Sequence, residues 1–317
     1  MNYTTIDLFA GVGGIRDGFE ENGFVTVYAN DFDPKCKKTY DLNSKETKLT
    51  IMDFKNVEYK KIPDFDILLG GFPCQAFSIA GYRKGFTDEK GRGDLFFNIA
   101  QLIETKKPKA FLLENVKNLA THDQGRTLKI IIETLSDLGY YVKHKVMNTM
   151  EYGNIPQNRE RIYIVGFNNF DSYENFEFPK PINLTVSFRD FLEENVPDKY
   201  YYNNKPLYDK IKDEVISYDS VYQWRRLYVR ENKKGVCPTL TANMGTGGHN
   251  VPIIKDIKGI RKLTPKECFM LQGFASNFKL PNLADTNLYK QAGNSVSVPV
   301  IARVAKNMRK ALEDKFN

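Results

Sequence analysis

The sequence predicts an α/β protein whose larger part is a parallel sheet covered by helices. Short β-branched runs alternate with longer segments of helical periodicity through the first half of the chain, which is the pattern of such a sheet. The first of these runs leads into a glycine turn that opens a helix, at residues 11–14. From about Pro179 the periodicity weakens, and Tyr, Asn, Lys and Pro become frequent. These observations indicate a regular α/β domain followed by a smaller domain of irregular strands and long loops.

The expected elements follow one another at short intervals. Apolar runs bounded by turn residues predict strands over Thr4–Phe9, Val25–Asn30, Ile67–Gly70, Ala110–Glu114, Tyr141–Met147 and Ile162–Phe167. Helical periodicity predicts helices over Ile15–Glu21, Lys35–Asn43, Asp94–Thr105, Leu128–Leu138, Leu263–Gln272 and Pro299–Asp314. Thr264 and Pro265 are a typical helix start, with the acid Glu267 close behind them. The apolar stripe of the last helix indicates that it packs back on the first domain.

These patterns divide the chain into parts with different expected roles. Residues 1–185 are expected to form the larger domain, which residues 291–317 complete. Residues 186–260 are expected to form the smaller domain, and residues 261–290 a connecting hinge with a helix. The chain shows no internal repeat and no low-complexity segment.

Composition narrows the class of protein. The chain of 317 residues has no apolar run long enough to cross a membrane, and its start does not resemble a secretory signal. Its 4 cysteines and 3 histidines lie far apart, so no metal site is expected. We therefore expect a metal-free protein of a reduced, cytoplasmic compartment with no membrane partner.

Positive charge gathers in one window of the sequence. Lys and Arg exceed Asp and Glu by 46 − 39 = 7 over the whole chain, a modest excess. Residues 221–262 alone hold nine basic residues against two acids, and Tyr222, Trp224 and Tyr228 lie among the arginines. A solvated basic face is the plain alternative, but interleaved aromatic and basic side chains favour a nucleic-acid surface.

Cys74 is the candidate nucleophile. It follows the apolar run Phe65–Leu69 and two glycines, and Pro73 stiffens the loop directly before it. A cysteine on a rigid loop at a strand end is well placed to attack a substrate as a thiolate. A single cysteine is more often buried and inert, so this interpretation depends on the elements that accompany it.

The glycine turn is the candidate cofactor site. Gly11, Gly13 and Gly14 depart from the Gly-x-Gly-x-x-Gly dinucleotide pattern, and the turn lacks the Lys-Ser/Thr pair that holds a polyphosphate. Asp31 stands 20 residues after Gly11 at the end of the next strand, where it can accept both ribose hydroxyls. With this acid the turn suits a nucleoside without phosphates, such as S-adenosylmethionine. Without Asp31, a tight turn with no ligand would be as good an interpretation of these glycines as a cofactor site.

Three further segments carry candidate polar groups. Glu114 ends an apolar strand, so desolvation is expected to raise its pKa and let it donate a proton; a capping or salt-bridged glutamate is the alternative. Arg159 and Arg161 alternate on an extended segment and are expected to share a face, where they could hold a phosphate or a carbonyl oxygen; a solvated edge is the alternative. Asn294 and Ser295 precede the last helix and could simply cap it.

Taken in order, these segments resemble the motifs of the bacterial DNA (cytosine-5) methyltransferases of type II restriction-modification systems. The resemblance covers about residues 4–312 and includes the Pro-Cys-Gln loop at 73–75, Glu114–Val116, Gln157–Arg161 and the Arg-x-Leu-Thr-x-x-Glu segment Arg261–Glu267. It implies a Rossmann-like class I methyltransferase sheet with helices on both faces, and a smaller target-recognition domain. The implied reaction is transfer of a methyl group from S-adenosylmethionine to C5 of a flipped cytosine.

The resemblance also implies roles for individual residues. Cys74 would be the nucleophile, Glu114 the acid at N3 of the base and Arg161 a contact to its O2, with Arg159 beside them. The cofactor would be held by Phe9, Gly11, Gly13, Gly14, Asp31, Phe32, Asp53, Phe54, Pro73, Leu95, Asn294, Ser295 and Val296. DNA contacts would come from Arg225, Arg226, Arg230, Thr239, Leu240, Gly247, Gly248 and His249. Ala80 departs from some relatives, which carry a serine there that helps fill the gap left by the flipped base.

Double-stranded DNA is the expected partner, and a monomer suffices to flip one base. A cognate restriction endonuclease would be a functional partner, and the expected location is the bacterial cytoplasm with its nucleoid DNA. Two alternatives stay open: a transfer-RNA cytosine-5 methyltransferase of similar fold, and a catalytically silent DNA-binding protein on the same fold. The basic second domain favours DNA over transfer RNA, and the intact Cys74, Glu114 and Asp31 favour an active enzyme.

Overall fold

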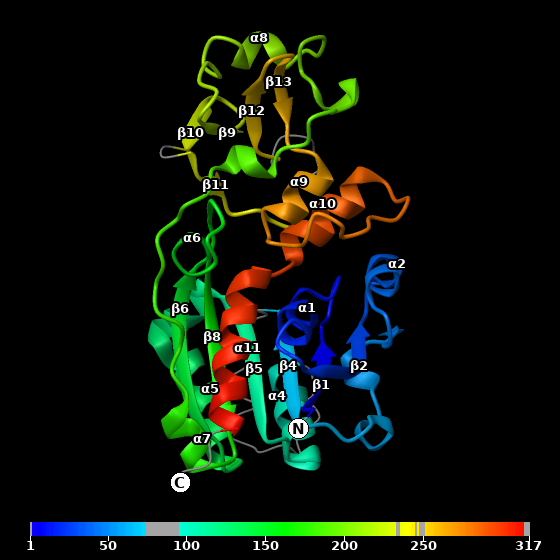
Figure 1. Cartoon of the computed structure of the whole chain (residues 1–317), viewed down its shortest axis with the longest axis vertical. Coiled ribbons are helices and arrows are strands. Elements are labelled where there is room, and N and C mark those ends of the chain that lie inside the picture. Colours follow the sequence, from blue (N-terminus) through cyan, green and yellow to red (C-terminus); the bar gives the residue numbers. More distant parts are fainter. Residues whose placement is uncertain (1, 74–94, 233–234, 245, 247–250, 314–317) are drawn as a thin grey trace. The chain divides into compact units, whose positions relative to one another are not determined.

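The computed structural model describes residues 2–73, 95–232, 235–244, 246 and 251–313. By its contacts the chain forms two compact units, one of Met1–Met147, Glu160–Lys180 and Val300–Asn317, the other of Asn148–Arg159 and Pro181–Pro299. Figure 1 shows the elements of both units, coloured from blue at the N-terminus to red at the C-terminus. The division differs from the ranges expected by role, because residues 148–159 and 291–299 group with the second unit. The assignment of roles to residues 1–185, 186–260, 261–290 and 291–317 stays a prediction.

A seven-stranded sheet in the order β3-β2-β1-β4-β5-β8-β6 forms the first unit. Its strands are β1 (Thr4–Leu8), β2 (Val25–Asp31), β3 (Leu49–Ile51), β4 (Ile67–Gly71), β5 (Ala110–Val116), β6 (Tyr141–Asn148) and β8 (Glu160–Phe167). The first five pair in parallel, whereas β8 runs antiparallel to β5. The predicted α/β fold is confirmed, but the sheet is mixed rather than parallel throughout. The short edge strand β3 was not expected from the sequence.

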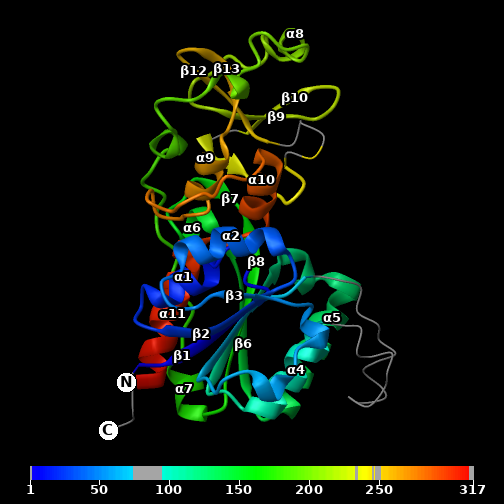
Figure 2. The same ribbon diagram turned by 90° about the vertical axis from the view of Figure 1, so that its right-hand side faces the viewer.

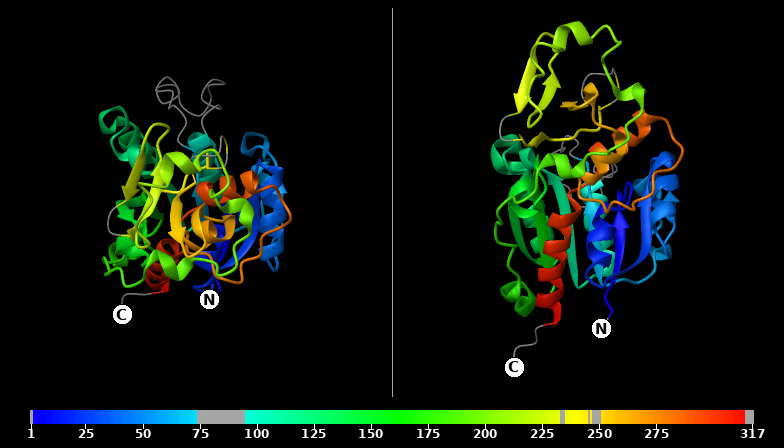
Figure 3. Two further views of the ribbon diagram at one scale, coloured as in Figure 1. Left: turned by 90° about the horizontal axis from the view of Figure 1, so that it is seen from above. Right: turned by 45° about the horizontal axis from the view of Figure 1, so that its top comes forward.

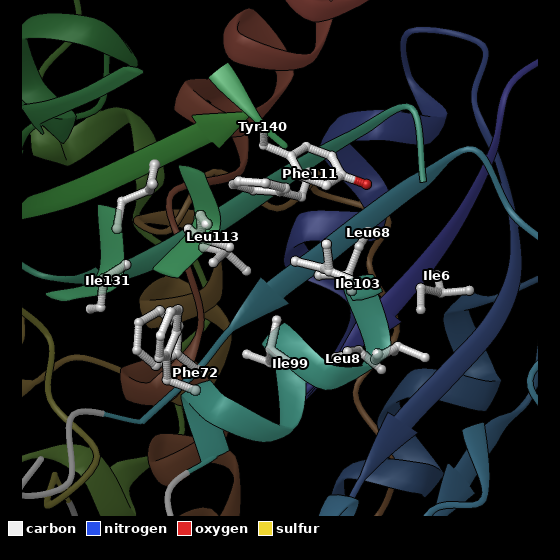
Figure 4. Close-up of a cluster of buried hydrophobic side chains, with 14 of the residues drawn as sticks. Ile6, Leu8, Leu68, Phe72, Ile99, Ile103, Phe111, Leu113, Ile131 and Tyr140 are labelled. Atoms are coloured by element: carbon white, nitrogen blue, oxygen red, sulfur yellow. The ribbon is translucent and has the colours of Figure 1, made fainter. Parts of the chain in front are cut away.

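Helices cover both faces of this sheet, as expected. In Figure 2, α4 (Leu95–Lys106) and α5 (Arg126–Asp137) lie on one face, and α1 (Gly14–Glu20) and α11 (Val298–Glu313) on the other. The unit also contains α2 (Pro34–Asn43) and the short α7 (Phe170–Asn175). Figure 4 shows the core on the side of α4 and α5, where strand side chains meet helix side chains; it labels Ile6, Leu8, Leu68, Phe72, Ile99, Ile103, Phe111, Leu113, Ile131 and Tyr140. Burial of these side chains holds the strand ends in fixed positions.

The last helix packs on the first unit, which confirms the expectation from its apolar stripe. A Cβ atom added to Gly18 of α1 would lie 2.7 Å from Ile301 of α11, so the two helices touch where α1 has no side chain. Asn22 donates to the carbonyl oxygen of Ala302 at 2.9 Å, and Arg309 donates to that of Asn22 at 2.6 Å. Figure 3 shows α11 as the red helix along the strands of this unit.

The second unit contains a four-stranded antiparallel sheet in the order β10-β9-β12-β13. Its strands are β9 (Val221–Trp224), β10 (Val229–Asn232), β12 (Ile253–Asp256) and β13 (Gly259–Lys262), and β7 (Gln157–Asn158) pairs in parallel with β11 (Cys237–Pro238). Its helices are α6 (Thr149–Tyr152), α8 (Tyr208–Ile211), α9 (Pro265–Met270) and α10 (Asp285–Asn294). The predicted helix Leu263–Gln272 is therefore shorter at both ends, and α10 was not expected.

A buried ion-pair cluster holds α9 to the sheet of the second unit. The guanidinium of Arg261 lies 2.8 Å from Glu267 and 2.6 Å from Asp256, and the side chains of Arg261 and Glu267 are almost fully buried. Glu267 also accepts the N–H of Thr264 at 2.7 Å, while the Thr264 hydroxyl accepts the N–H of Glu267 at 3.1 Å. This capping box confirms the helix start predicted from Thr264 and Pro265.

We predict that Arg261→Met destabilises the protein by about 3–5 kcal/mol, because Glu267 would stay buried without its counter-charge. Lys129→Met is the matched control. It removes an exposed ion pair with Glu133 on α5, and such pairs contribute about 1 kcal/mol or less. Urea unfolding of the three proteins measures both effects. Equal effects of the two substitutions would contradict a stabilising role of the buried cluster.

Candidate active site

Candidate residues of the first unit lie where parallel strands end. Strands β1, β2, β4 and β5 run in the same direction, with Leu8 opposite Gly70 and Gly71 opposite Glu114. Their carboxyl ends therefore share one edge of the sheet, which is where open α/β sheets bind ligands. The glycine turn follows β1, and the main chain that leads to Cys74 follows β4.

Asp31 closes β2 beside the glycine turn. Its Oδ2 accepts the N–H of Gly11 at 2.8 Å, and its Oδ1 accepts the N–H of Asp33 at 2.8 Å. Burial raises the pKa of this carboxyl, and the N–H groups of Asp33 and Gly11 partly oppose that rise. Each carboxylate oxygen can accept a further hydrogen bond, which fits the expected recognition of two ribose hydroxyls.

The two left-handed glycines of the turn serve different purposes. Gly11 has φ +54°, and a Cβ atom built there meets nothing within 4 Å, so the backbone leaves open space beside the Asp31 carboxyl. Gly13 has φ +91°, and a Cβ atom there would lie 2.8 Å from the guanidinium carbon of Arg16. Arg16 is fully buried and lies over the ring of Tyr40 at 4.2 Å. Gly11 thus leaves space for a ligand, while Gly13 makes room for the chain's own arginine.

The other expected cofactor residues of this unit divide into surface and core positions. Phe32, directly after Asp31, is 69% exposed, and Pro73 is also exposed. Asp53 accepts the N–H of Lys55 at 3.1 Å and caps a short helix. Leu95 and Phe9 are partly buried against the core, and Gly14 is the first residue of α1. Phe54 is buried and packs against Phe9 with ring centroids 5.3 Å apart. Its expected contact with the cofactor stays a prediction.

Glu114 and Arg161 form an ion pair across β5 and β8. Nε of Arg161 lies 3.2 Å from Oε1 of Glu114, and both side chains are nearly buried. Antiparallel pairing explains the meeting, since Arg161 lies opposite Val116 and so diagonally next to Glu114. The other oxygen of Glu114 lies 3.7 Å from the Cβ position of Gly71, three residues before Cys74. An acid and a cation thus meet at the start of the cysteine loop.

Asn115 is a site residue to which the sequence reasoning assigned no role. Its side chain is buried and donates to the carbonyl oxygen of Phe72 at 2.9 Å, so it holds the main chain two residues before Cys74. In the sequence, only its position between Glu114 and Val116 indicated that Asn115 belongs to the site. Cys74 itself lies outside the described residues.

The described cysteines are poor nucleophiles. Cys36, Cys237 and Cys268 are all buried thiols. Burial raises the pKa of both Cys237 and Cys268, which disfavours the reactive thiolate. This comparison leaves Cys74 as the candidate.

Arg159 and Arg161 meet different partners, and the expectation that they share a face stays a prediction. Arg159 belongs to the second unit, is 2% exposed and donates to main-chain carbonyl oxygens, among them that of Leu240 at 2.8 Å. Leu240 is fully buried, and its expected contact with DNA stays a prediction. Thr239 donates its hydroxyl to the carbonyl of Asn158 at 2.6 Å. These residues form an internal junction of the second unit.

The segment 294–296 also belongs to the second unit. Asn294 is the exposed last residue of α10, and the N–H of Ser295 bonds to the carbonyl oxygens of Gln291 and Ala292. Asn294 and Ser295 therefore end α10, whereas the alternative interpretation was that they cap the last helix, α11. Ser295 and Val296 are both buried.

Exposed arginines gather at the β9–β10 hairpin. Arg225, Arg226 and Arg230 are exposed, and Leu227 at the turn is 91% exposed. Gly247, Gly248 and His249 lie outside the described residues. Among the residues that are described, no group of three metal-ligating side chains comes together, and no helix is long and apolar enough to span a membrane.

Comparison with known proteins connects this site to a family. Residues 3–310 match the family described as C-5 cytosine-specific DNA methylase. The chain is 56% identical over 310 residues to the Type II methyltransferase M.Bsp6I of Bacillus sp. (strain RFL6), which covers 96% of this chain and 98% of that protein. It is 44% identical over 318 residues to the Type II methyltransferase M.HaeII of Haemophilus aegyptius, covering 98% and 94%.

Solved structures show the same fold at low identity. The Entamoeba histolytica methyltransferase EhMeth is 20% identical, with a TM-score of 0.75 over 99% of this chain and 100% of that one. The S. pombe Dnmt2 methyltransferase is 19% identical, also with a TM-score of 0.75, over 99% and 100%. These likenesses confirm the Rossmann-like methyltransferase sheet. Because the family match spans nearly the whole sequence, the chain belongs to the C-5 cytosine-specific DNA methylases, which take their methyl group from S-adenosylmethionine.

Proposed function

We propose that this DNA cytosine-5 methyltransferase acts through a covalent Cys74 adduct, with Glu114 as the acid at N3 of the flipped cytosine and Arg161 at its O2. The supporting observation is the ion pair of Glu114 and Arg161 at 3.2 Å, beside the strand end that leads to Pro73 and Cys74. A carboxyl and a guanidinium at that position match two adjacent polar atoms on one edge of the base.

The reaction needs these groups because C5 of cytosine is a weak nucleophile. Addition of the Cys74 thiolate to C6, with a proton from Glu114 to N3, converts the ring into an enamine whose C5 is nucleophilic. S-adenosylmethionine supplies the methyl group. Loss of the C5 proton to solvent, expulsion of the thiolate from C6 and return of the N3 proton to Glu114 then restore the aromatic ring. Because the target atoms are stacked inside the duplex, the base must first be flipped out.

We propose that Asp31 binds the ribose of the cofactor. Gly11, which has no side chain, lets the cofactor approach the main chain beside Asp31. Phe32 offers an exposed ring directly after Asp31, and Asp53 a carboxylate after β3. Asn294, Ser295 and Val296 stay proposed cofactor residues. Arg225, Arg226 and Arg230 are proposed to contact DNA phosphates, which orient the protein but carry no sequence information.

We propose duplex DNA as the substrate and restriction-modification as the context, which the DNA methylase family and the Type II relatives support. We further propose that the enzyme acts as a monomer on nucleoid DNA in a bacterial cytoplasm, and that it protects sites cut by a cognate endonuclease. Bisulfite sequencing of DNA from cells that express the protein would map the modified site. Labelled-methyl transfer to transfer RNA but not to duplex DNA would contradict the proposal.

We predict that Cys74→Ser abolishes methyl transfer and leaves duplex binding largely intact, because the thiolate is needed only for the covalent step. Glu114→Gln should lower the single-turnover rate about 10²–10⁴-fold, the range for loss of a general acid. Transfer of labelled methyl groups to duplex DNA measures both, with Lys129→Met as the active control. Substantial methylation by the serine variant would rule out the adduct.

Asp31→Asn should weaken S-adenosylmethionine binding by about 1–3 kcal/mol, because the amide puts an uncharged NH2 donor in place of one of the two acceptor oxygens in a buried site. Protonation of Asp31 has the same effect, so affinity in the parent should fall as the pH drops through the raised pKa. The variant should lose this pH dependence. Calorimetric titration from neutral to acidic pH tests both points, with the fully exposed Asp64→Asn as control. Unchanged affinity in Asp31→Asn would show that the ribose contact is misplaced.

Exchange of residues 186–260 for those of a relative with another specificity should change the methylated site. By contrast, Arg225→Ala should lower the affinity for DNA of any sequence. It should also reduce the slope of log affinity against log salt concentration by about 1, because one phosphate contact is lost. Bisulfite mapping of the chimera and salt titrations of the arginine variant provide the measurements. An active chimera that still methylates the original site would locate specificity elsewhere.

A further inference from the structure

The buried guanidinium of Arg159 connects two segments of the second unit that are far apart in the sequence. It donates to the carbonyl oxygen of Leu240 at 2.8 Å, to that of Gly293 at 3.3 and 3.4 Å, and to that of Ser295. We call Thr239–Thr241 the recognition segment and Gly293–Val296 the cofactor segment, after their proposed roles. Arg159 therefore touches the main chain of both.

The position of Arg159 at the end of α10 suits its charge. Gly293 and Ser295 lie at the C-terminus of this helix, where carbonyl oxygens lack partners within the helix and carry partial negative charge. A guanidinium is planar and can donate to several acceptors at fixed angles. The arginine thus stabilises the helix end while fixing the direction in which the cofactor segment leaves it.

Gln157 supports the same junction from the other side of Leu240. Its Oε1 accepts the N–H of Leu240 at 3.2 Å, and its Nε2 donates to the carbonyl of Leu271 at 2.6 Å. Gln272 in turn donates to the carbonyl of Ala292 at 2.7 Å. Both polar groups of the Leu240 main chain are therefore held by the Gln157–Arg159 segment.

Direct backbone contact brings the two segments as close as they can lie. A Cβ atom at Gly293 would lie 2.1 Å from the carbonyl oxygen of Thr241, far inside any real contact distance. Only glycine permits this approach. Because the obstacle is main chain rather than a flexible side chain, a larger residue must push the segments apart.

From these contacts we infer that Arg159 is a positioning residue that couples the recognition segment to the cofactor segment, and that it does not touch the substrate. The inference rests on the proposed roles of the two segments. If they hold the duplex and the cofactor, an altered junction changes binding of both ligands together. A residue that contacts the reacting base, as proposed for Arg161, would instead affect the chemical step.

The test compares Arg159→Met, Arg159→Lys and Gly293→Ala with Arg161→Met. Calorimetry measures the affinity for S-adenosylhomocysteine with and without a duplex that carries the site mapped in the parent. Single-turnover transfer compares that site with a duplex altered at one base pair. Thermal unfolding first establishes that each purified variant is folded.

Arg159→Met should weaken S-adenosylhomocysteine and duplex binding each by roughly tenfold or more, and should reduce discrimination between the two duplexes. Arg159→Lys keeps a cationic donor and should recover part of each loss. Gly293→Ala keeps the arginine but separates the segments, so it should show the same losses that are expected of Arg159→Met. It therefore tests the inference independently if Arg159→Met does not fold. Arg161→Met should retain both affinities and lose turnover.

An Arg159→Met variant that binds both ligands as the parent does and loses only turnover would overturn the inference, because Arg159 would then act on the base. Parent-like behaviour of Gly293→Ala in all measurements would overturn it as well. A parent protein that methylates no duplex would instead refute the proposed function. The affinities for S-adenosylhomocysteine would still decide the role of Arg159.

Discussion

Parallel pairing of β1, β2, β4 and β5 is the constraint on which the chemistry of the first unit depends. It places the carboxyl ends of these strands at one edge, so the glycine turn, Asp31, the approach to Cys74 and Glu114 all emerge there. The hydrogen bond from Gly11 to Asp31 is a direct product of this geometry. A core of branched and aromatic side chains beneath the strands prevents the edge from shifting.

Buried charge supports the glycine turn from within. Arg16 lies under Gly13 and pairs with Asp17, while Asp7 near the end of β1 is fully buried. Burial raises the pKa of Asp7 to about 8, although the positive charge of Arg16 acts in the opposite direction. Desolvation of the Asp7 carboxyl therefore outweighs its attraction to Arg16. The turn itself is open at Gly11 and filled by the Arg16 side chain at Gly13.

Three arginines illustrate how partners determine the role of one residue type. Arg161 meets the carboxylate of Glu114, so the pair can present a charged edge to a base. Arg159 meets carbonyl oxygens at a helix end and organises main chain. Arg261 meets two carboxylates in a buried cluster and stabilises its unit. We therefore expect a different defect from the substitution of each arginine, because each meets different partners.

The sequence by itself determined the α/β class, the order of most elements and the identity of the chemical groups, because periodicity, glycine turns and strand-end acids are local signals. It also indicated the helix start at Thr264 and the return of the last helix to the first unit. Only the tertiary structure decided which partners the polar groups meet. The strand pattern around Arg159 could not name its partners, because its contacts come from residues more than 80 positions away. The antiparallel direction of β8, the burial of Leu240 and the close approach at Gly293 likewise depend on segments distant in sequence, and no local pattern encodes such contacts.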